Sequence, residues 1–531
     1  MGAKSSRIAR KPAVVEAKRI AAEFDVSAED VRKTVAHFVR QMEDGLSKDG
    51  DTMIPSYLTA LPTGTEKGVC LAVDIGGTNC RVCSVELHGD RTFSIKQTKS
   101  IIPRNLRIGS TSADLFSFIA HEVERFLKKH YSSKYEAHRA RGRDSPVVEN
   151  ESTQVDHLPL GFTFSFTFQQ VAIDKGIMAR WDKGFDIPDT IGKDVCGLLQ
   201  EQIDKLDVPV HVTALANDTV GTLMARSYTS LDDGSSILGA VFGTGTNGAY
   251  IEKRKNVTRL GSSNEQADHM IINTEWGSFD EALTVLPTTP YDERLNEADT
   301  HPGEQMLEKR VSGMYLGELF RLVLVSILEN SELGFLGTSS KVGLPKDSLL
   351  FKPYGVDTSI MSALGTDDSS MLSAARRCLE KEFGIAKVSI EAAAVAKVIA
   401  EAIGRRAARL SGAAIAAVVV KTGRLNDSTE KAKYLDVGVE GALVEHYPGF
   451  EKNIRDALRD VPEIGAAGEQ RIRIGLAKDG SGVGAALIAM VADKQKSRAA
   501  EAVADGAPKK GLEVVQETKL STAEMQMIAV G

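Results

Sequence analysis

The sequence predicts an α/β protein of more than one domain, because strand-like and helix-like patterns alternate along the chain. The 531 residues are 42% apolar and 26% charged, which is typical of a folded protein with a large core. At about 100 to 200 residues per domain, this length indicates at least two domains.

The predicted elements follow from the spacing of apolar residues. Residues 68–87 indicate a strand, a glycine turn and a second strand, and residues 158–168 indicate another strand. Residues 112–130 have the spacing of an amphipathic helix. Residues 210–215 are an apolar strand that leads into a polar step and a helix. The Ala-rich stretch 388–420 predicts helices packed closely on another element, since small side chains let backbones approach.

Charge and composition exclude several classes of protein. The 65 Lys and Arg residues against 72 Asp and Glu give a net charge of -7, so bulk nucleic-acid binding is not expected. The apolar stretch 410–420 has 11 residues, whereas a membrane helix needs about 20. The five cysteines include one close pair, Cys80 and Cys83, which a strand would place on opposite faces. We expect no disulfide, no zinc site and a reducing, cytoplasmic location.

Three segments lack a folded pattern. The first 20 residues carry six basic residues against one acid, and Met1, Gly2 and Ser6 have the spacing of an N-myristoylation site. A lipid and basic anchor on a membrane or mitochondrial surface competes with an organelle-targeting tail, and a solvated basic tail is favoured over both. Residues 134–157 predict an exposed loop and residues 494–531 a loosely held tail.

One pattern occurs twice, at residues 71–82 and 239–250. Each copy is an apolar strand, a glycine-rich turn bearing Thr and Asn, and a second strand. Successive backbone N–H groups and the Thr hydroxyl of such a turn can bind one anion, because glycine permits positive φ and removes the Cβ that would block the approach. Either copy alone is more typical of an ordinary hairpin. The pair suggests two lobes that grip a polyphosphate from both sides.

Asp218 follows the predicted strand 210–215, in the run Leu215-Ala-Asn-Asp-Thr. A carboxylate at a strand end lies where α/β sheets bind ligands. It could accept the proton of a hydroxyl nucleophile while the two turns and Mg²⁺ neutralise the transferred phosphoryl group. The alternative is a helix N-cap, which this segment alone favours.

Glu275 and Glu308 are further candidate site acids, because a carboxylate can accept hydrogen bonds from a vicinal diol of a sugar. The alternative for both is a solvated surface acid. Trp181 and Trp276 lie beside polar motifs and are candidate walls of a cleft, although a place in the core is equally expected.

The motifs together resemble those of the eukaryotic-type hexokinase family, nearest its fungal glucokinase-like branch, over residues 15–493. They occur in the family's order: LAVDIGGTN, LGFTFSF, KGFDIP, ANDTVGT, FGTGTN, NTEWGSF, EKRVSGMYLGELFR and DGSGVGAAL. The resemblance implies the actin-like ATPase (ribonuclease-H-like) fold, in which small and large α/β domains close over a central cleft. It also implies transfer of the γ-phosphoryl group of Mg-ATP to the 6-hydroxyl of a hexose, with glucose as the first expectation.

The resemblance also implies roles for single residues. Two catalytic residues are expected: Asp218, which matches the base at the 6-hydroxyl, and Lys183, which matches the family's sugar-contacting lysine. The sugar-binding residues are expected to be Ser165, Phe166, Thr167, Asp182, Lys183, Asn217, Asp218, Asn247, Glu275, Gln305 and Glu308. The ATP-binding residues are expected to be Asp74, Gly76, Gly77, Thr78, Asn79, Arg81, Gly243, Thr244, Gly245, Gly441, Gly480, Ser481 and Gly482. No side chain is expected to bind the metal directly, since the ATP phosphates hold most of the Mg²⁺ contacts.

The implied division of the chain has two domains and two tails. The expected limits are a basic tail at 1–14, a large domain at 15–70 and 219–470, a small domain at 71–218 and 471–493 with 134–157 inserted as a loop, and a C-terminal tail at 494–531.

Three positions depart from the family pattern. Thr167 stands where Pro is usual, Asp182 where a Thr precedes Lys183, and Ala442 where a Ser offers its hydroxyl to the nucleotide. The charge of Asp182 would pair with Lys183 or change the preferred hexose, and the change at Ala442 would weaken ATP binding by about 0.5 to 1.5 kcal/mol. Two alternatives therefore stay open: a sugar-binding regulator with little or no catalysis, and a kinase for another hexose such as N-acetylglucosamine.

Overall fold

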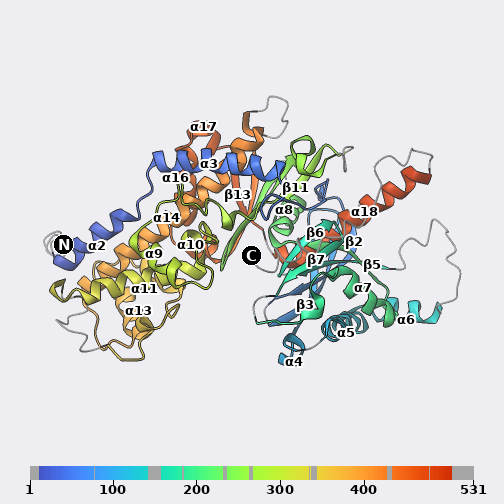
Figure 1. Cartoon of the computed structure of the whole chain (residues 1–531), viewed down its shortest axis with the longest axis horizontal. Helices are drawn as coiled ribbons and strands as arrows, with labels where there is room; N and C mark the ends of the chain where they lie inside the picture. Colours follow the sequence, from blue (N-terminus) through green and yellow to red (C-terminus); the bar gives the residue numbers. More distant parts are fainter. Residues whose placement is uncertain are drawn as a thin grey trace.

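The computed structural model consists of two lobes, each built around one large β-sheet (Figure 1). Helix α14 runs through the lobe on the left, and helices α5 and α7 cover the sheet on the right. The structure describes residues 11–76, 78–109, 111–141, 157–164, 166–181, 184–230, 236–261, 267–333, 335, 344–426, 433–477 and 479–504.

The sheet of the left lobe has six strands in the order β1-β11-β10-β9-β12-β13. Strands β1, β11, β10 and β9 pair antiparallel, whereas β12 lies parallel to both β9 and β13. The strands are β1 (Ile54–Pro55), β9 (Ser236–Phe242), β10 (Thr246–Lys253), β11 (His269–Asn273), β12 (Leu435–Glu440) and β13 (Ile472–Leu476).

The sheet of the right lobe repeats this arrangement in the order β4-β3-β2-β5-β8. Its first three strands are antiparallel, and β5 lies parallel to both β2 and β8. The strands are β2 (Lys67–Ile75), β3 (Asn79–His88), β4 (Phe93–Ile101), β5 (Leu158–Phe164) and β8 (Val210–Ala216), and a separate hairpin is formed by β6 (Thr167–Ala172) and β7 (Lys175–Arg180). The two glycine turns predicted from the sequence therefore occupy equivalent places, between β2 and β3 and between β9 and β10.

Helices α8 (Asp218–Thr229) and α18 (Ala485–Ala504) lie between the two sheets and contact each other. Helix α8 packs on β9 and β12, and α18 packs on β2, β5 and β8. Both approaches require glycine, since a Cβ on Gly239 would collide with the backbone of Leu223 and one on Gly161 with the backbone of Ala485. Helix α8 thus brings the end of β8, and with it Asp218, onto the sheet of the other lobe.

The remaining helices of the left lobe mostly cluster around α14 and extend away from the sheet, whereas α5 and α7 cover one face of the sheet in the right lobe (Figure 1). In the left lobe they are α2 (Pro12–Glu23), α3 (Ala28–Ser47), α9 (Pro290–Ala298), α10 (Glu308–Val311), α11 (Gly313–Glu329), α12 (Thr358–Gly365), α13 (Ser373–Phe383), α14 (Ile390–Thr422), α15 (Ala442–His446), α16 (Phe450–Arg459) and α17 (Gly465–Glu469). In the right lobe they are α4 (Arg104–Arg107), α5 (Ser112–His130), α6 (Ser132–Arg141) and α7 (Val195–Lys205), and the π turn η9 (Gly480–Gly484) precedes α18.

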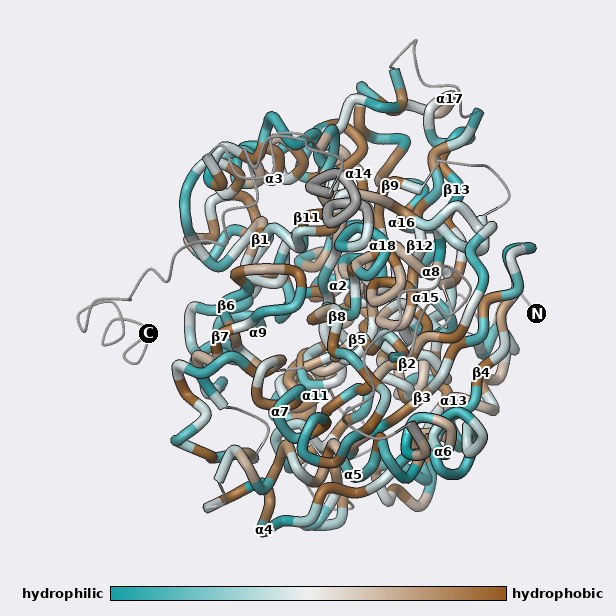
Figure 2. Tube along the Cα trace, turned by 90° about the vertical axis from the view of Figure 1, so that its right-hand side faces the viewer, coloured by the Kyte–Doolittle hydropathy of each residue, from teal (hydrophilic) through white to brown (hydrophobic). Residues whose placement is uncertain are grey.

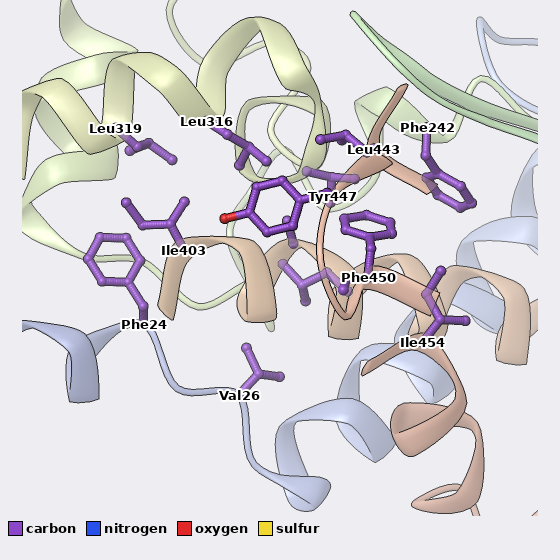
Figure 3. Close-up of a cluster of buried hydrophobic side chains, with 14 of the residues drawn as sticks. Phe24, Val26, Phe242, Leu316, Leu319, Ile403, Leu443, Tyr447, Phe450 and Ile454 are labelled. Carbon is purple, nitrogen blue, oxygen red and sulfur yellow. The ribbon is translucent and has the colours of Figure 1, made fainter. Parts of the chain in front are cut away.

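The core of the left lobe gathers around α14 (Figure 3). The hydroxyl of Tyr447 donates to the carbonyl of Ala400 at 2.7 Å, and a Cβ on Gly404 would collide with the Tyr447 ring. The Ala-rich stretch is therefore one continuous helix that packs closely on its neighbours, where several helices were predicted.

Two segments are more helical than predicted. Residues 12–14 are not part of a tail but open α2, where Ala13 and Val14 are buried. Residues 134–141 belong to α6 and not to a loop. Helix α6 is mostly hydrophilic and lies on the outside of the molecule (Figure 2). It is held by a tertiary contact in which the Tyr135 hydroxyl donates to Glu124 at 2.6 Å, a contact that composition alone does not reveal.

The C-terminal predictions also change. Residues 494–504 continue α18, where Lys496 pairs with Asp174 at 2.5 Å. Residues 471–493 were expected in the smaller domain, but strand β13 pairs with β12 in the six-stranded sheet. The rest of that range, from η9 on, packs on the five-stranded sheet. The other domain limits stay a prediction. Residues 1–10, 142–156 and 505–531 lie outside the described residues.

Cys80 and Cys83 face opposite sides of β3, as predicted, and all five cysteines are free. Within the described ranges, no helix combines the length and apolar character that crossing a bilayer requires.

Candidate active site

Glu275, directly after β11, is the centre of a hydrogen-bonded group of amides. Its Oε1 accepts from Nδ2 of Asn273 at 2.6 Å and from Nδ2 of Asn247 at 3.1 Å. Asn247 lies on β10 and Asn273 on β11, so two adjacent strands supply the donors. Glu275 itself has φ 48°, which turns the chain sharply at the end of the strand. The carboxylate is therefore held in one orientation.

The electrostatics of Glu275 connect it to two other acids. Burial raises its pKa to about 7, and the negative charges of Asp218 and Glu308 raise it as well, against the hydrogen bonds from Asn273 and Asn247. Glu275 follows β11, Glu308 accepts from the Thr246 N–H at the start of β10, and α8, which begins at Asp218, packs on both strands. Three separate segments of the chain thus bring these acids to the same part of the sheet.

Asp218 is the first residue of α8 and is exposed. The helix cap is supplied by its neighbour Asn217, whose Oδ1 accepts from the N–H groups of Thr219 at 2.9 Å and Val220 at 3.4 Å. The Asp218 Oδ1 accepts from the Thr219 N–H at 2.8 Å. The N-cap alternative thus applies to Asn217 rather than to Asp218.

Glu308 joins the acid group to the second glycine turn. Its Oε2 accepts from the N–H of Thr246 at 2.9 Å, and a Cβ on Gly245 would lie 2.8 Å from the same oxygen. Gln305 lies three residues earlier with φ 55°, and its Nε2 donates to the hydroxyl of Ser278 at 3.0 Å. Asn247, Glu275, Gln305 and Glu308 are thus brought together as predicted, although their roles toward a sugar stay a prediction.

The second glycine turn, residues 243–245, has its carbonyls satisfied from within the protein. The carbonyls of Gly243 and Thr244 accept from the first N–H groups of α11, those of Gly313 at 2.8 Å and Met314 at 3.1 Å. The Gly243 N–H donates to the Gly245 carbonyl at 3.0 Å. Among the described residues, the N–H groups of Thr244 and Gly245 have no acceptor. Two backbone donors of this turn are thus available for an anion.

Gly441 lies against the same turn. It has φ 118°, and a Cβ there would lie 2.7 Å from the Gly243 N–H. Ala442 follows it as the first residue of α15 and offers no hydroxyl.

The first glycine turn is closed by a hydrogen bond from the Gly76 N–H to the Asn79 carbonyl at 3.1 Å. The Thr78 side chain is exposed, and a Cβ on Gly76 would meet nothing within 4 Å. Gly77 lies outside the described residues. As far as the described residues show, the space in front of Gly76 is therefore open.

Arg81 connects this turn to the Gly480 segment. Its guanidinium donates to both carboxylate oxygens of Asp479, at 3.0 and 2.8 Å, to Asp74 at 3.3 Å and to the Ser481 hydroxyl at 2.6 Å. Burial raises the pKa of Asp74, and the charge of Arg81 opposes that rise. The Gly482 N–H donates to Asp479 at 3.0 Å. Most of the Arg81 donors are thus engaged by the protein itself.

On the right lobe, Phe166 is buried in a ring cluster, with its centroid 4.7 Å from Trp181 and 4.9 Å from Phe185. Thr167 opens β6 and pairs with Arg180. Ser165, Asp182 and Lys183 lie outside the described residues, so their predicted place at the sugar is not described.

Comparisons with known proteins decide the family. Residues 16–228 and 237–491 match two family models, both described as hexokinase. The chain is 49% identical over 492 residues to a glucokinase of Aspergillus niger, covering 91% of this chain and 98% of that protein. It is 40% identical over 513 residues to glucokinase-1 of Saccharomyces cerevisiae, with the same coverage of 91% and 98%.

The chain belongs to the hexokinase family. Among solved structures, it is similar to a hexokinase from Schistosoma mansoni complexed with glucose, with 32% identity and a TM-score of 0.71 over 89% of this chain and 98% of that one. The fold is accordingly the actin-like ATPase fold that was predicted. The duplication in this fold is visible as the same strand order in the two sheets.

Several residues of the site were not predicted from the sequence. Asn273 holds Glu275, Asp479 holds Arg81, and Glu440 contacts Gly480. Asn273 and Asp479 stand within the quoted motifs NTEWGSF and DGSGVGAAL and could have been found there. Glu440 stands in the segment 439–443 that departs from the family pattern, but nothing in that segment points to its partner Gly480, which lies 40 residues further along the chain.

Proposed function

We propose that this protein transfers the γ-phosphoryl group of ATP to the 6-hydroxyl of glucose. One observation supports the proposal: Glu275 and Glu308 lie beside the second glycine turn, which presents two available backbone donors, and the helix that begins at Asp218 packs on β10 and β11 next to them. Membership of the hexokinase family, with glucokinases among the similar relatives, supports the same reaction.

The sugar is held by the group at the end of β10 and β11. Oxygens of Glu275 and Glu308 accept from vicinal sugar hydroxyls, and the amides of Asn247 and Gln305 offer donors and acceptors in reach of the same ring. Because Asn273 and Asn247 orient Glu275, little rotation is needed when a sugar binds. The small-lobe segment with Ser165, Phe166, Thr167, Asp182 and Lys183 is proposed to close on the opposite face of the sugar.

Asp218 acts as the general base. In the reaction the sugar O6–P bond forms and the bond between Pγ and the β,γ-bridging oxygen breaks, so that ADP leaves. The proton of the 6-hydroxyl passes to the Asp218 carboxylate. The Asp218 carboxylate is exposed at the start of α8, on the side from which the hydroxyl is proposed to arrive, and Asn217 caps the helix in its place.

The nucleotide is proposed to arrive as Mg-ATP, with the metal held mainly by its phosphates. The two glycine turns bind the phosphates through backbone N–H groups, which lower the barrier mostly by electrostatic stabilisation. The Gly480 segment is proposed to lie near the adenosine, since the N–H groups of Gly480 and Gly482 already donate to Glu440 and Asp479. Ala442 leaves one hydrogen bond to the nucleotide unmade. A cytoplasmic location remains part of the proposal, and no partner besides hexose and ATP is proposed.

The test is a coupled sugar-phosphate assay on the purified protein with glucose, mannose, fructose and N-acetylglucosamine. Turnover of glucose that is lost in Asp218→Ala, with sugar binding retained, is the expected result. Glucose binding without turnover in the unmodified protein would contradict the proposal and would favour the sugar-binding regulator. Faster turnover of N-acetylglucosamine than of glucose would instead correct the substrate.

A further inference from the structure

Glu440 is the last residue of β12 and touches two segments that the reaction uses. Its Oε2 accepts from the N–H of Gly480 at 2.9 Å and lies 3.3 Å from the hydroxyl of Thr222. Thr222 belongs to the first turns of α8, and its hydroxyl donates to the carbonyl of Asp218 at 2.9 Å. One carboxylate oxygen thus stands between the Gly480 turn and the backbone of the base.

The atoms around Glu440 Oε2 are closely packed. A Cβ on Gly480 would lie 2.8 Å from Glu440 Oε2 and 2.9 Å from the Asp218 carbonyl, and it would collide with the Thr222 hydroxyl. Next to Thr222 on α8, a Cβ on Gly221 would collide with the Gly480 carbonyl. The Gly480 turn and α8 therefore meet backbone to backbone, and a small shift of either one moves the other.

Glu440 is also tied to the second glycine turn through the chain. The next residue, Gly441, has φ 118° and lies against Gly243. Hence a single strand end is fixed on one side to the turn at 243–245 and on the other to Gly480 and α8.

We propose that Glu440 is a positioning residue for phosphoryl transfer, whose carboxylate locks the Gly480 turn onto the first turns of α8 and so sets Asp218 in register with the nucleotide. This inference rests on the proposed function. It goes beyond it, because Glu440 needs no contact with sugar or ATP to act.

The carboxylate of Glu440 is only partly buried, and no basic side chain among the described residues forms an ion pair with it. Burial raises its pKa, and the charges of Asp479 and Asp218 raise it too, against the hydrogen bond from Gly480. The two contacts of Glu440 require a hydrogen-bond acceptor at a fixed distance from the backbone of residue 440. A negative charge is less important for them. Glutamine satisfies that requirement, whereas aspartate is shorter by one C–C bond of about 1.5 Å and leaves the Gly480 N–H without its partner.

The experiment compares Glu440→Gln, Glu440→Asp and Glu440→Ala in steady-state kinetics with glucose and ATP varied separately. We expect Glu440→Asp and Glu440→Ala to lower kcat about tenfold and to raise KM for ATP, which corresponds to about 1.4 kcal/mol at the transition state. KM for glucose should change less than twofold, because the Glu275 group is not touched. Glu440→Gln should recover most of the kcat that Glu440→Ala loses.

Two controls separate positioning from loss of the fold. Glu86→Gln removes an exposed carboxylate of β3 and should leave the kinetics unchanged. Glucose binding, followed by tryptophan fluorescence, and the urea midpoint of unfolding are measured for every variant. A Glu440→Ala enzyme with unchanged kcat and KM for ATP, or one in which KM for glucose rises as much as KM for ATP, would overturn the inference. A Glu440→Gln enzyme as impaired as Glu440→Ala would overturn it as well.

Activity of the unmodified protein is measured first in the same assay. Its absence would overturn the proposed function and, with it, this inference. An active enzyme that ignores the Glu440 substitutions would overturn only the role of Glu440.

Discussion

Asn247 donates to the carboxylate of Glu275 at 3.1 Å, although the two residues are 28 positions apart in the chain. The contact exists because β10 and β11 pair antiparallel and place Asn247 near the strand end from which Glu275 follows. Asn273 completes the arrangement with a second donor at 2.6 Å. Burial and the nearby acids disfavour the ionised carboxylate, whereas both donors stabilise it. The pKa of Glu275 therefore lies near neutral pH, at about 7.

Sugar affinity should depend on pH through Glu275. Its pKa of about 7 means that it is largely protonated at pH 6 and ionised at pH 8. The ionised form accepts from two hydroxyls, so we expect glucose to bind about tenfold more weakly at pH 6 than at pH 8. Fluorescence titration across this range measures the effect, and Glu275→Gln should bind weakly at every pH. A wild-type affinity that is flat from pH 6 to pH 8 would contradict the assignment.

The same shift affects stability without sugar. Folding raises this pKa above its ordinary value of 4.5, so the folded state keeps a proton that the unfolded chain releases. The stabilising contribution is fully present below pH 4.5 and is lost as the pH rises through about 7. We expect the difference in urea midpoint between wild type and Glu275→Gln to change in this window, with the wild type losing stability relative to the variant.

Gly76 offers a test of the first glycine turn, because a Cβ there meets no atom of the described residues within 4 Å. Gly76→Ala should therefore fold with an unchanged midpoint. If ATP occupies the open space, the added methyl group raises KM for ATP by about tenfold or more, equivalent to about 1.4 kcal/mol of binding. Gly50→Ala is the matched control, since Gly50 is equally unobstructed but lies outside the site. Equal KM values for ATP in both variants would show that the nucleotide does not approach this turn.

Much of the fold could be predicted because local patterns and tertiary structure agree. The turns at 76–78 and 243–245 lie between strands with clear apolar runs, and α5 begins and ends where the amphipathic pattern does. Helix α6 was missed because its polar sequence has no apolar period and is stabilised by a contact with α5. The polar end of α18 was missed for the same reason, since it continues a helix that packs on the smaller sheet.

The candidate site was predicted in part. Asp218, Glu275 and Glu308 are recognisable from their motifs, and the pairing of β10 with β11 and the packing of α8 on both strands bring their segments together. The residues that orient them are harder to find. Glu440 reaches Gly480 only because β12 ends beside η9, and that register depends on the pairing of β9, β12 and β13. A single sequence contains no signal for such a long-range contact.

Trp181 should report sugar binding, whereas Trp276 should not. Trp181 is partly exposed and stacks at 5.4 Å on Phe185 in the ring cluster of the small lobe, next to the segments proposed to close on the sugar. Trp276 is buried, and its indole N–H donates to the Thr246 hydroxyl at 3.0 Å. We expect the glucose-dependent fluorescence change to disappear in Trp181→Phe and to persist in Trp276→Phe. The opposite result would show that the environment that changes on sugar binding is that of Trp276, in the larger lobe.

Arg406 and Asp292 should determine the stability of the larger lobe without affecting the chemistry. The guanidinium of Arg406 is fully buried and donates to both oxygens of Asp292, at 2.6 and 2.7 Å, while its plane covers the ring of Phe24 at 4.8 Å. Arg406→Met leaves the Asp292 carboxylate buried without its partner. Such a loss costs about 3 to 5 kcal/mol, and urea unfolding monitored by circular dichroism measures it.

The double variant tests the cause of that loss. Asp292→Asn keeps an oxygen for the Thr289 N–H, which now donates to the Asp292 carboxylate at 2.8 Å, but it carries no charge that needs an arginine. Adding Asp292→Asn to Arg406→Met should therefore recover part of the lost stability, because no uncompensated charge remains in the core. The KM values for glucose and ATP of the folded variants should equal those of the wild type. If the double variant is no more stable than Arg406→Met, the unpaired charge of Asp292 is not the cause of the loss, and the lost packing of Arg406 on Phe24 accounts for it instead.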